Sequence, residues 1–172
     1  MPDLNPVLSK EEIEKAVAEL AQQISNDYQN REVVFVGVLK GAFIFLADLV
    51  RYLSIPVQVD FVRLSSYGCL TETSGSICLT KELEIDITGR DVLVVEDIID
   101  TGLSLEFLLD HLKSKEPKSV RICTLIDKRE RRDRHFTIDY VGCVVEQGFL
   151  VGYGLDHAEQ YRHLPAIYDL KI

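Results

Sequence analysis

Three carboxylates follow one apolar run closely enough to act on the same ligand. Glu96, Asp97 and Asp100 lie within five residues, directly after residues 91–95. Like charges this close repel one another, and they ionise together only where a cation or hydroxyl donors compensate. Carboxylates accept hydrogen bonds from ligand hydroxyls and can bind Mg²⁺. The pattern predicts a polar binding site, and the alternative is an acidic loop that only faces water.

The turn continues into the expected start of a helix at residues 101–112, through Thr101, Gly102, Leu103 and Ser104. The first N–H groups of a helix have no intrahelical acceptor, and with the helix dipole they favour a phosphate. An acidic rim beside an anion site suits a sugar phosphate, because carboxylates accept from ribose hydroxyls and help to hold magnesium. The segment is not a Walker motif, which requires G-x-x-x-x-G-K-[ST].

Continuous apolar runs predict the elements that position this turn. Residues 33–38, 91–95 and 120–126 are rich in valine, isoleucine and leucine, as strands buried on both faces of a parallel sheet are. Helices are expected between them, at 42–53 and 101–112. The predicted fold class is α/β, with a central, mainly parallel sheet flanked by helices. Ligands bind at the carboxyl ends of the strands in such sheets.

The rest of the chain completes a single domain of 172 residues. Ser9 and Glu12 match a capping box that begins an amphipathic helix with apolar positions from Ile13 to Ile24. Further strands are expected at 57–64, 76–83, 140–145 and 150–153, with a long loop at 65–75. Because no helix separates the last two strands, we expect them to pair with each other or to extend the edge of the sheet.

Charge and composition disfavour several classes of partner. The chain has 19 Lys and Arg against 28 Asp and Glu, a net charge of −9, which disfavours binding to nucleic acid or to a membrane surface. Its four cysteines show no C-x-x-C spacing, so we expect reduced thiols. The N-terminus has no leader pattern, and the apolar run at 42–46 is far below the about 18 residues of a span. We expect a cytoplasmic protein.

The turn at 94–104 resembles the phosphoribosyl pyrophosphate signature of type I phosphoribosyltransferases, and more narrowly of their bacterial hypoxanthine-guanine branch. Four further segments share the resemblance: 37–42, 65–68, 127–129, and 151–156 with Tyr161 and Arg162. It implies the fold of that family, with a small hood and a flexible lid loop at about 65–75. It also implies purine salvage, in which 5-phosphoribose passes from phosphoribosyl pyrophosphate to N9 of hypoxanthine or guanine, with Mg²⁺ as cofactor. A homodimer or homotetramer, with Lys40 near an interface, is expected on the same basis.

By this resemblance, Glu96 and Asp97 meet the ribose hydroxyls and Mg²⁺, Asp156 meets a second Mg²⁺, and Asp100 is the general base at N7 of the purine. The other residues implied to bind phosphoribosyl pyrophosphate are Lys40, Gly41, Ile99, Thr101, Gly102, Leu103 (through its backbone alone), Ser104 and Arg162. The Leu39–Lys40 peptide is expected to be cis. Without the resemblance, Lys40 would equally be interpreted as a lysine at the start of a helix. The alternative interpretation of Asp156 and Arg162 is that they are surface residues.

The base-binding residues implied by the resemblance are Lys128, Phe149, Leu150 and Asp156. Lys128 would meet O6 of the purine, and since an ammonium has donors and no acceptor, it favours a 6-oxopurine over adenine. Phe149 would stack on the base. Without the resemblance, Phe149 would equally be interpreted as an ordinary core residue. The rest of the run 129–134 is predicted to be a solvated face.

Two segments bear on the limits of the resemblance. Ser66 and Tyr67 lie in the expected lid, which would exclude water from the reaction centre, and the alternative is a loop without function. Cys69 stands where a small polar residue is typical. Residues 142–148 depart from the Gly-Phe and Ile-Pro-Asp pattern that usually precedes the stacking aromatic, so the approach to the base differs from the family pattern.

Two other functions remain open. A regulator could keep the transferase fold and bind nucleotide to control RNA or DNA, using Arg129, Arg131, Arg132 and Arg134 as a basic patch. A sister transferase could act on xanthine, adenine or a pyrimidine. Lys128 disfavours adenine only, because hypoxanthine, guanine and xanthine all carry a 6-oxo group.

Overall fold

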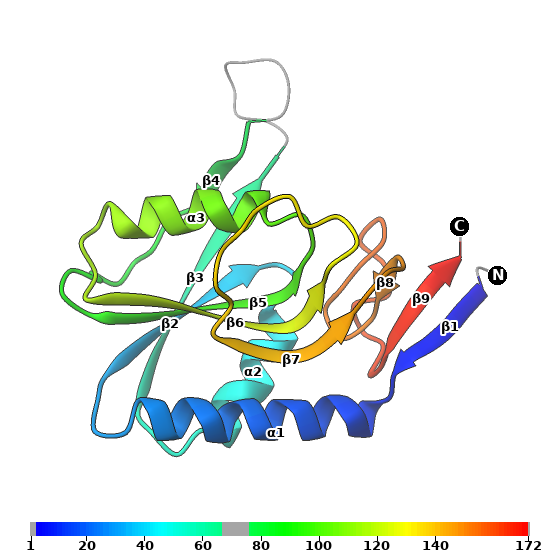
Figure 1. Cartoon of the computed structure of the whole chain (residues 1–172), viewed down its shortest axis with the longest axis horizontal. Coiled ribbons are helices and arrows are strands. Elements are labelled where there is room, and N and C mark those ends of the chain that lie inside the picture. The colour runs from blue at the N-terminus through cyan, green and yellow to red at the C-terminus, as the bar shows by residue number, and fades with distance from the viewer. Residues whose placement is uncertain (1–2, 67–75, 172) are drawn as a thin grey trace.

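The computed structural model describes residues 3–66 and 76–171, and its centre is a mainly parallel sheet (Figure 1). Within these residues the sheet has six strands in the order β4-β3-β2-β5-β6-β7. The parallel strands are β2 (Val33–Leu39), β3 (Val57–Ser65), β5 (Asp91–Ile99), β6 (Ser119–Lys128) and β7 (Tyr140–Val145), and the short β4 (Cys78–Lys81) is antiparallel to β3. The predicted α/β class is confirmed.

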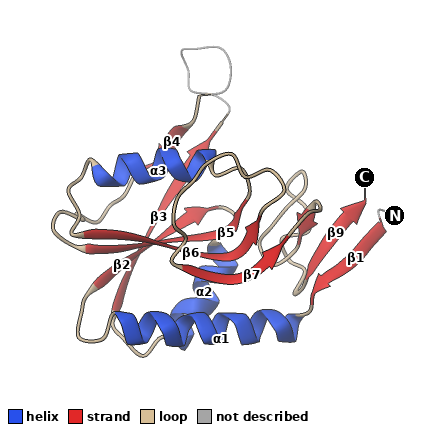
Figure 2. Cartoon of the chain, in the orientation of Figure 1, coloured by secondary structure: helices blue, strands red, loops and turns tan. Residues whose placement is uncertain are grey.

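Helices cover both faces of this sheet (Figure 2). Helices α1 (Lys10–Asp27) and α2 (Phe43–Tyr52) lie on one face, and α3 (Leu103–Lys113) lies on the other. The predicted capping box begins α1, with the Glu12 amide donating to Ser9 Oγ at 3.1 Å and the Ser9 amide donating to Glu12 Oε2 at 2.7 Å. None of the helices in the described ranges has the length and hydropathy to cross a lipid bilayer.

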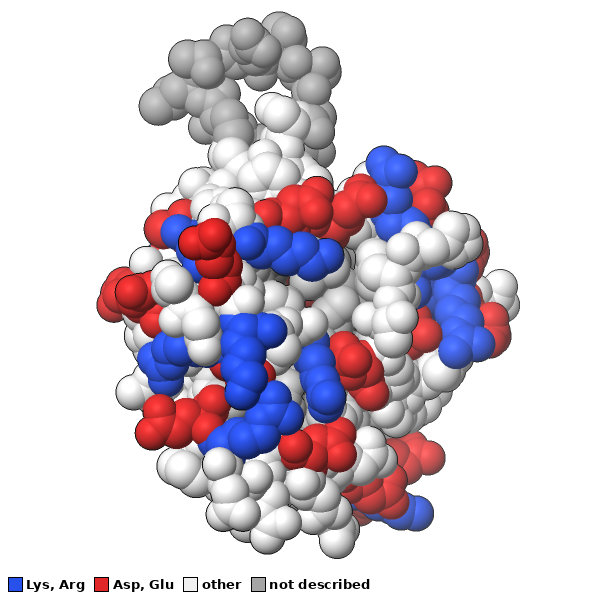
Figure 3. Space-filling model, turned by 60° about the vertical axis from the view of Figure 1, so that its left-hand side comes forward, with Lys and Arg blue, Asp and Glu red and all other residues white. Residues whose placement is uncertain are grey.

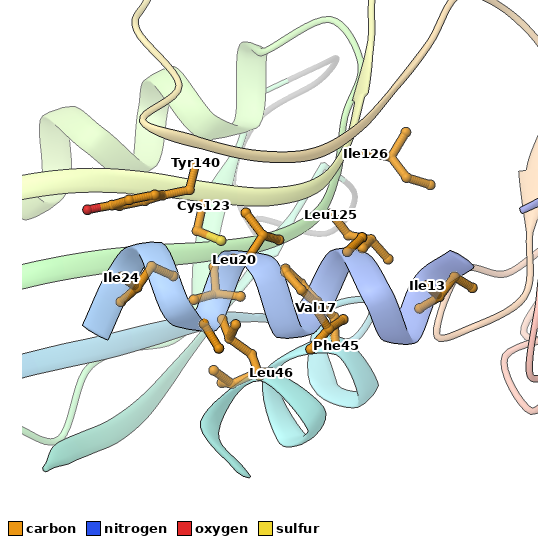
Figure 4. Packing of buried hydrophobic residues seen from close by; sticks show 14 of the residues in the cluster. Ile13, Val17, Leu20, Ile24, Phe45, Leu46, Cys123, Leu125, Ile126 and Tyr140 are labelled. Atoms are coloured by element: carbon orange, nitrogen blue, oxygen red, sulfur yellow. The ribbon is translucent and has the colours of Figure 1, made fainter. Parts of the chain in front are cut away.

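Helix α1 holds the sheet through a dense apolar cluster (Figure 4). Val17, Leu20 and Ile24 are at most 2% exposed and pack with Phe45 of α2 and Cys123 of β6. Fully burying a Leu or Ile side chain contributes roughly 1.5–3 kcal/mol, so this helix fixes the sheet edge that carries β6 and β7.

A second, smaller sheet forms the hood that the family resemblance implies. In the described part of the chain it has three antiparallel strands in the order β1-β9-β8, namely β1 (Asp3–Leu8), β9 (Ile167–Lys171) and β8 (Leu150–Val151). The two ends of the chain therefore lie side by side (Figure 1). The strand expected at 150–153 exists in shortened form, whereas β1 and β9 were not predicted, because their burial patterns do not alternate.

Other boundaries differ from expectation at the site itself. Strand β5 runs to Ile99 rather than ending at Val95, because Glu96 and Ile98 continue the ladder with Thr124 and Ile126 of β6. Helix α3 begins at Leu103 rather than at residue 101, since Gly102 takes a left-handed conformation with φ of 89°. The expected strand at 76–83 is confined to β4.

The loop and cysteine expectations have mixed outcomes. Ser66 is exposed at a bend after β3, while Tyr67 and Cys69 lie outside the described residues. Cys78 is disulfide-bonded, so the expectation that all cysteines are reduced is wrong, whereas Cys123 and Cys143 are free thiols. Pairing depends on how close the fold brings two Cα atoms, which spacing along the chain does not give.

Candidate active site

Two adjoining cavities lie at the carboxyl ends of the central strands, and both are lined by Ile98 and Asp100. The turn cavity, of about 280 Å³, is lined by Val38, Leu39, Leu64, Glu96, Ile98, Ile99, Asp100, Thr101, Gly102, Ser104 and Leu105. The hood cavity, of about 350 Å³, is lined by Lys40, Gly41, Asp97, Ile98, Asp100, Lys128, Arg131, Gly148, Phe149, Leu150, Leu155, Asp156 and Arg162. Most of the predicted site residues are thus brought together.

The turn cavity is built around the start of α3. The glycine at 102 is required there, because a Cβ at that position would lie 2.8 Å from the Phe136 ring and φ is +89°. The Leu103 amide reaches Thr101 Oγ1 at 3.4 Å, and the Leu103 side chain is 38% exposed and lines neither cavity. Such a helix start offers backbone N–H groups to an anion.

Glu96 and Asp97 form a carboxyl pair between the two cavities. Burial, and then the neighbouring Asp97, hold the pKa of Glu96 well above its usual range. Burial also raises the pKa of Asp97 to about 6, although the Ile98 amide, which donates to Asp97 Oδ1 at 2.8 Å, and the Arg162 charge oppose that rise. The positive charge near the pair is therefore too small to keep both carboxylates ionised. A bound cation would stabilise their ionised forms.

A magnesium ion fits this donor set when substrate supplies the remaining ligands. Among the residues that the structure describes, no three His, Cys, Asp or Glu side chains group closely enough to form a metal cage. Mg²⁺ is commonly held by one or two carboxylates together with substrate phosphates and water. Asp156, which shares the hood cavity with Asp97, accepts from the Glu159 amide at 2.8 Å and pairs with Arg162 at 3.1 Å.

Asp100 has one occupied and one free carboxylate oxygen. Its Oδ2 lies 2.5 Å from Arg131 Nη2 and 3.6 Å from Lys128 Nζ. Its Oδ1 is buried and accepts no hydrogen bond from any residue of the described ranges. A buried acceptor without a partner is costly to leave empty, so this oxygen is placed to take a proton or an N–H from a ligand.

The base-binding residues predicted from the resemblance line the hood cavity. Lys128 and Leu150 are buried, but Phe149 is 43% exposed and is not the ordinary core residue that was its alternative. The Phe149 amide donates to Asp169 Oδ1 at 2.9 Å, which fixes its backbone to β9. Its ring packs edge-on against His157, with centroids 5.3 Å apart.

Lys40, Gly41 and Arg162 meet at the junction of two loops. The Leu39–Lys40 peptide is cis, as expected. A Cβ on Gly41 would lie 1.9 Å from Asp97 Oδ2, so only glycine fits between the loop and that carboxylate. Arg162 donates to the Gly154 carbonyl at 2.7 Å, and its side chain is 19% exposed rather than on the surface. The 39–42 and 152–162 loops therefore form one wall of the hood cavity.

Residues 5–158 match the family model described as "Phosphoribosyl transferase domain". The chain belongs to the phosphoribosyltransferase family. Two similar relatives are named hypoxanthine-guanine phosphoribosyltransferase: that of Aquifex aeolicus (strain VF5) is 48% identical over 166 residues, covering 96% of this chain and 93% of its own. That of Bacillus subtilis (strain 168) is 44% identical over 170 residues, covering 98% and 94%. A crystal structure of a Bacillus anthracis hypoxanthine-guanine phosphoribosyltransferase with a HEPES molecule in its active site superposes with a TM-score of 0.91, at 44% identity and 100% coverage of both chains.

In this phosphoribosyltransferase, most of the run 129–134 is exposed, which confirms the predicted solvated face, and Arg132 is the exception. Arg132 is 18% exposed at its side chain; it pairs with Asp127 and donates to the Asp100 carbonyl at 3.0 Å. It fastens the loop after β6 to the end of β5. Nothing in the sequence indicated that Arg132 would differ from the other arginines of the run. Only the tertiary fold brings it into contact with Asp127 and the Asp100 carbonyl.

The other arginines of this run also form ion pairs, which remove the basic patch that a nucleic-acid regulator would need. Arg129 pairs with Asp127 at 3.2 Å, Arg131 with Asp100, and Arg134 with Glu106 at 3.0 Å. Figure 3 shows Lys and Arg side chains next to Asp and Glu side chains on the face it displays. Paired charges give a weak external field, so the regulator alternative has no support here.

Proposed function

We propose that this chain transfers 5-phosphoribose from phosphoribosyl pyrophosphate to N9 of hypoxanthine or guanine, forming IMP or GMP and pyrophosphate in purine salvage. The observation that carries this proposal is the meeting of the two cavities at Asp100. One side offers the start of a helix to a phosphate, and the other offers Lys128 and Phe149 to a purine. A sugar phosphate and a base bound in these cavities would adjoin at the carboxylate.

The sugar donor would bind across both cavities. Its 5′-phosphate would accept hydrogen bonds in the turn cavity from the amides and hydroxyls of residues 101–104, with Ile99 at the same wall. Glu96 and Asp97 would accept from the ribose hydroxyls. The pyrophosphate would extend into the hood cavity, where Gly41 leaves the backbone accessible and Lys40 and Arg162 supply positive charge.

Magnesium would be held by Glu96 and Asp97 with the ribose, and by Asp156 with the pyrophosphate. When bound, it neutralises charge on the departing pyrophosphate. The raised pKa values of Glu96 and Asp97 support this assignment, because a divalent cation would replace the proton that burial favours.

The acceptor base would be chosen in the hood cavity. Lys128 would donate to O6, which a 6-oxopurine offers and the 6-amino group of adenine does not. Asp100 would accept from N7 through its free Oδ1 and take the proton that the base loses. Phe149 would stack on the purine, and the backbone of Leu150 would face its edge.

The proposed oligomeric state and cellular location each depend on one observation. Phe43 and Tyr52 of α2 are 43% and 52% exposed, which supports self-association on the face next to Lys40, as a homodimer or homotetramer. A cytoplasmic location follows from the substrate, because a polyphosphorylated sugar does not cross a membrane unaided.

The test is pyrophosphate release from phosphoribosyl pyrophosphate and Mg²⁺ with hypoxanthine, guanine, xanthine and adenine in turn. We expect turnover with hypoxanthine or guanine and none with adenine. Turnover with xanthine distinguishes the proposed enzyme from a sister transferase that prefers xanthine. Lys128 alone cannot distinguish them, since all three 6-oxopurines offer it an O6 acceptor. Absence of turnover with every 6-oxopurine would contradict the proposal.

A further inference from the structure

Glu159 connects the two cations that the proposed function gives to pyrophosphate. Its Oε2 lies 2.8 Å from Lys40 Nζ, and its Oε1 lies 3.3 Å from Arg162 Nη2. Both cations line the hood cavity. The carboxylate reaches Lys40 from 119 residues along the chain, so the contact is a product of the tertiary fold.

The backbone that carries Glu159 is held in an uncommon shape. His157 and Gln160 close a two-residue turn, with amide-to-carbonyl distances of 3.2 Å and 3.0 Å. Ala158 and Glu159 between them have φ values of 50° and 64°, and neither is glycine. Left-handed backbone is unfavourable for a non-glycine residue, and such strain concentrates at functional sites. The turn aims an anion at the two cations.

We propose that the Glu159 carboxylate is a stand-in anion, which occupies Lys40 and Arg162 in the substrate-free enzyme and is displaced by the pyrophosphate group. This inference rests on the proposed function. The Glu159 side chain is 64% exposed, and an exposed ion pair contributes little to stability, so a more highly charged phosphate group displaces it readily. Once displaced, the carboxylate stays nearby and repels the pyrophosphate. Glu159 therefore lowers pyrophosphate affinity and favours release of the product.

A purely structural role predicts the opposite sign. If Glu159 only held Lys40 and Arg162 in place for the substrate, its removal would disorder both cations and weaken pyrophosphate binding. The direction of the change in pyrophosphate affinity therefore shows whether Glu159 competes with pyrophosphate or positions Lys40 and Arg162 for it, even where the change is small.

The experiment compares wild type with Glu159→Gln, which keeps the size of the side chain and removes its charge. Titration calorimetry with inorganic pyrophosphate and Mg²⁺ should give a Kd about three- to tenfold lower in the variant, the change that loss of a roughly 1 kcal/mol competitor gives. The KM for phosphoribosyl pyrophosphate should fall with it, while the KM for hypoxanthine stays unchanged. Glu159→Asp, which keeps the charge, should change the Kd less than Glu159→Gln.

A second variant guards against a folding defect. Glu159→Gly removes the carboxylate and suits the left-handed φ of 64°, so it should also bind pyrophosphate more tightly. Glu14→Gln is the matched control, because Glu14 is exposed on α1, pairs with Lys10 at 3.7 Å and lines neither site cavity. Unchanged or weaker binding in both Glu159 variants would overturn the inference. If wild type itself bound no pyrophosphate, the proposed function would fail first.

Discussion

The turn cavity and the hood cavity share Asp100 yet are built in different ways. The turn cavity takes most of its wall from one continuous segment, residues 96–105, and offers mainly backbone amides and hydroxyls. The hood cavity gathers side chains from segments far apart in the chain, and its charged groups already pair, as Asp100 does with Arg131 and Lys40 with Glu159. The first offers backbone donors to an anion, whereas the proposed function requires the second to exchange these counter-ions for substrate groups.

The largest effect is expected where the two cavities meet. Asp100→Asn keeps the shape of the side chain but removes its ability to take a proton, so kcat should fall about 100-fold or more. Binding of phosphoribosyl pyrophosphate should stay within about twofold, because other residues hold the donor. Steady-state kinetics and donor titration measure both, with Asp110→Asn on the exposed side of α3 as the control. Unaltered turnover would exclude Asp100 as the base.

A change confined to the turn cavity should affect the donor alone. In Gly102→Ala the new Cβ would lie 2.8 Å from the Phe136 ring, so the start of α3 must shift. We expect the KM for phosphoribosyl pyrophosphate to rise about tenfold or more, since misplacement by about 1 Å costs that much in a positioned site. The KM for hypoxanthine should change little.

Gly89→Ala is the matched control for backbone strain. Gly89 has a φ of +68°, but nothing lies within 4 Å of its added Cβ. This variant should lose only about 1 kcal/mol of stability and keep the donor KM. Equal effects of the two alanines on the donor KM would show that the turn cavity does not depend on the close fit at Gly102.

A change confined to the hood cavity should affect the base alone. Phe149→Leu keeps an apolar side chain and removes the stacking surface, so the KM for hypoxanthine should rise roughly five- to tenfold, the scale of one base–aromatic stack. Kinetics at saturating donor measure this. An equal rise in the KM for phosphoribosyl pyrophosphate would mean that the cavities are not separable in this way.

The smallest effect is expected in the pH dependence of stability. Burial raises the pKa of Asp97 from 3.8 to about 6 and that of Glu96 well above 4.5. The folded state then binds more protons than the unfolded state above pH 4, so these two groups lower stability as pH rises through about 6. Glu96→Gln should remove part of that loss, on the order of 1 kcal/mol at pH 8, and Mg²⁺ should do the same for wild type.

Urea unfolding at pH 5 and pH 8, with and without Mg²⁺, measures this prediction. The informative quantity is the difference between wild type and Glu96→Gln, because other carboxylates such as Asp60 and Asp91 have lowered pKa values and titrate below this window. A difference that does not depend on pH would contradict the raised pKa values.

The same contrast explains what could be predicted from sequence. The acidic turn and α3 lie in one segment, so residue types and spacing located the turn cavity directly. Buried parallel strands were recognisable because both faces are apolar. The hood strands β1 and β9 were missed because they are short and only partly buried, so neither carries such an apolar run. Arg132 and Glu159 were missed for another reason: their contacts reach Asp100 and Lys40 only through the tertiary fold.

The most direct test of the proposed reaction is a competition among bases. Equimolar hypoxanthine, guanine and adenine would be incubated with limiting phosphoribosyl pyrophosphate and Mg²⁺, and the nucleotides formed would be identified by mass spectrometry. Lys128 and Asp100 in one cavity predict IMP, GMP or both, and no AMP. A product dominated by AMP, or no nucleotide at all, would contradict that assignment.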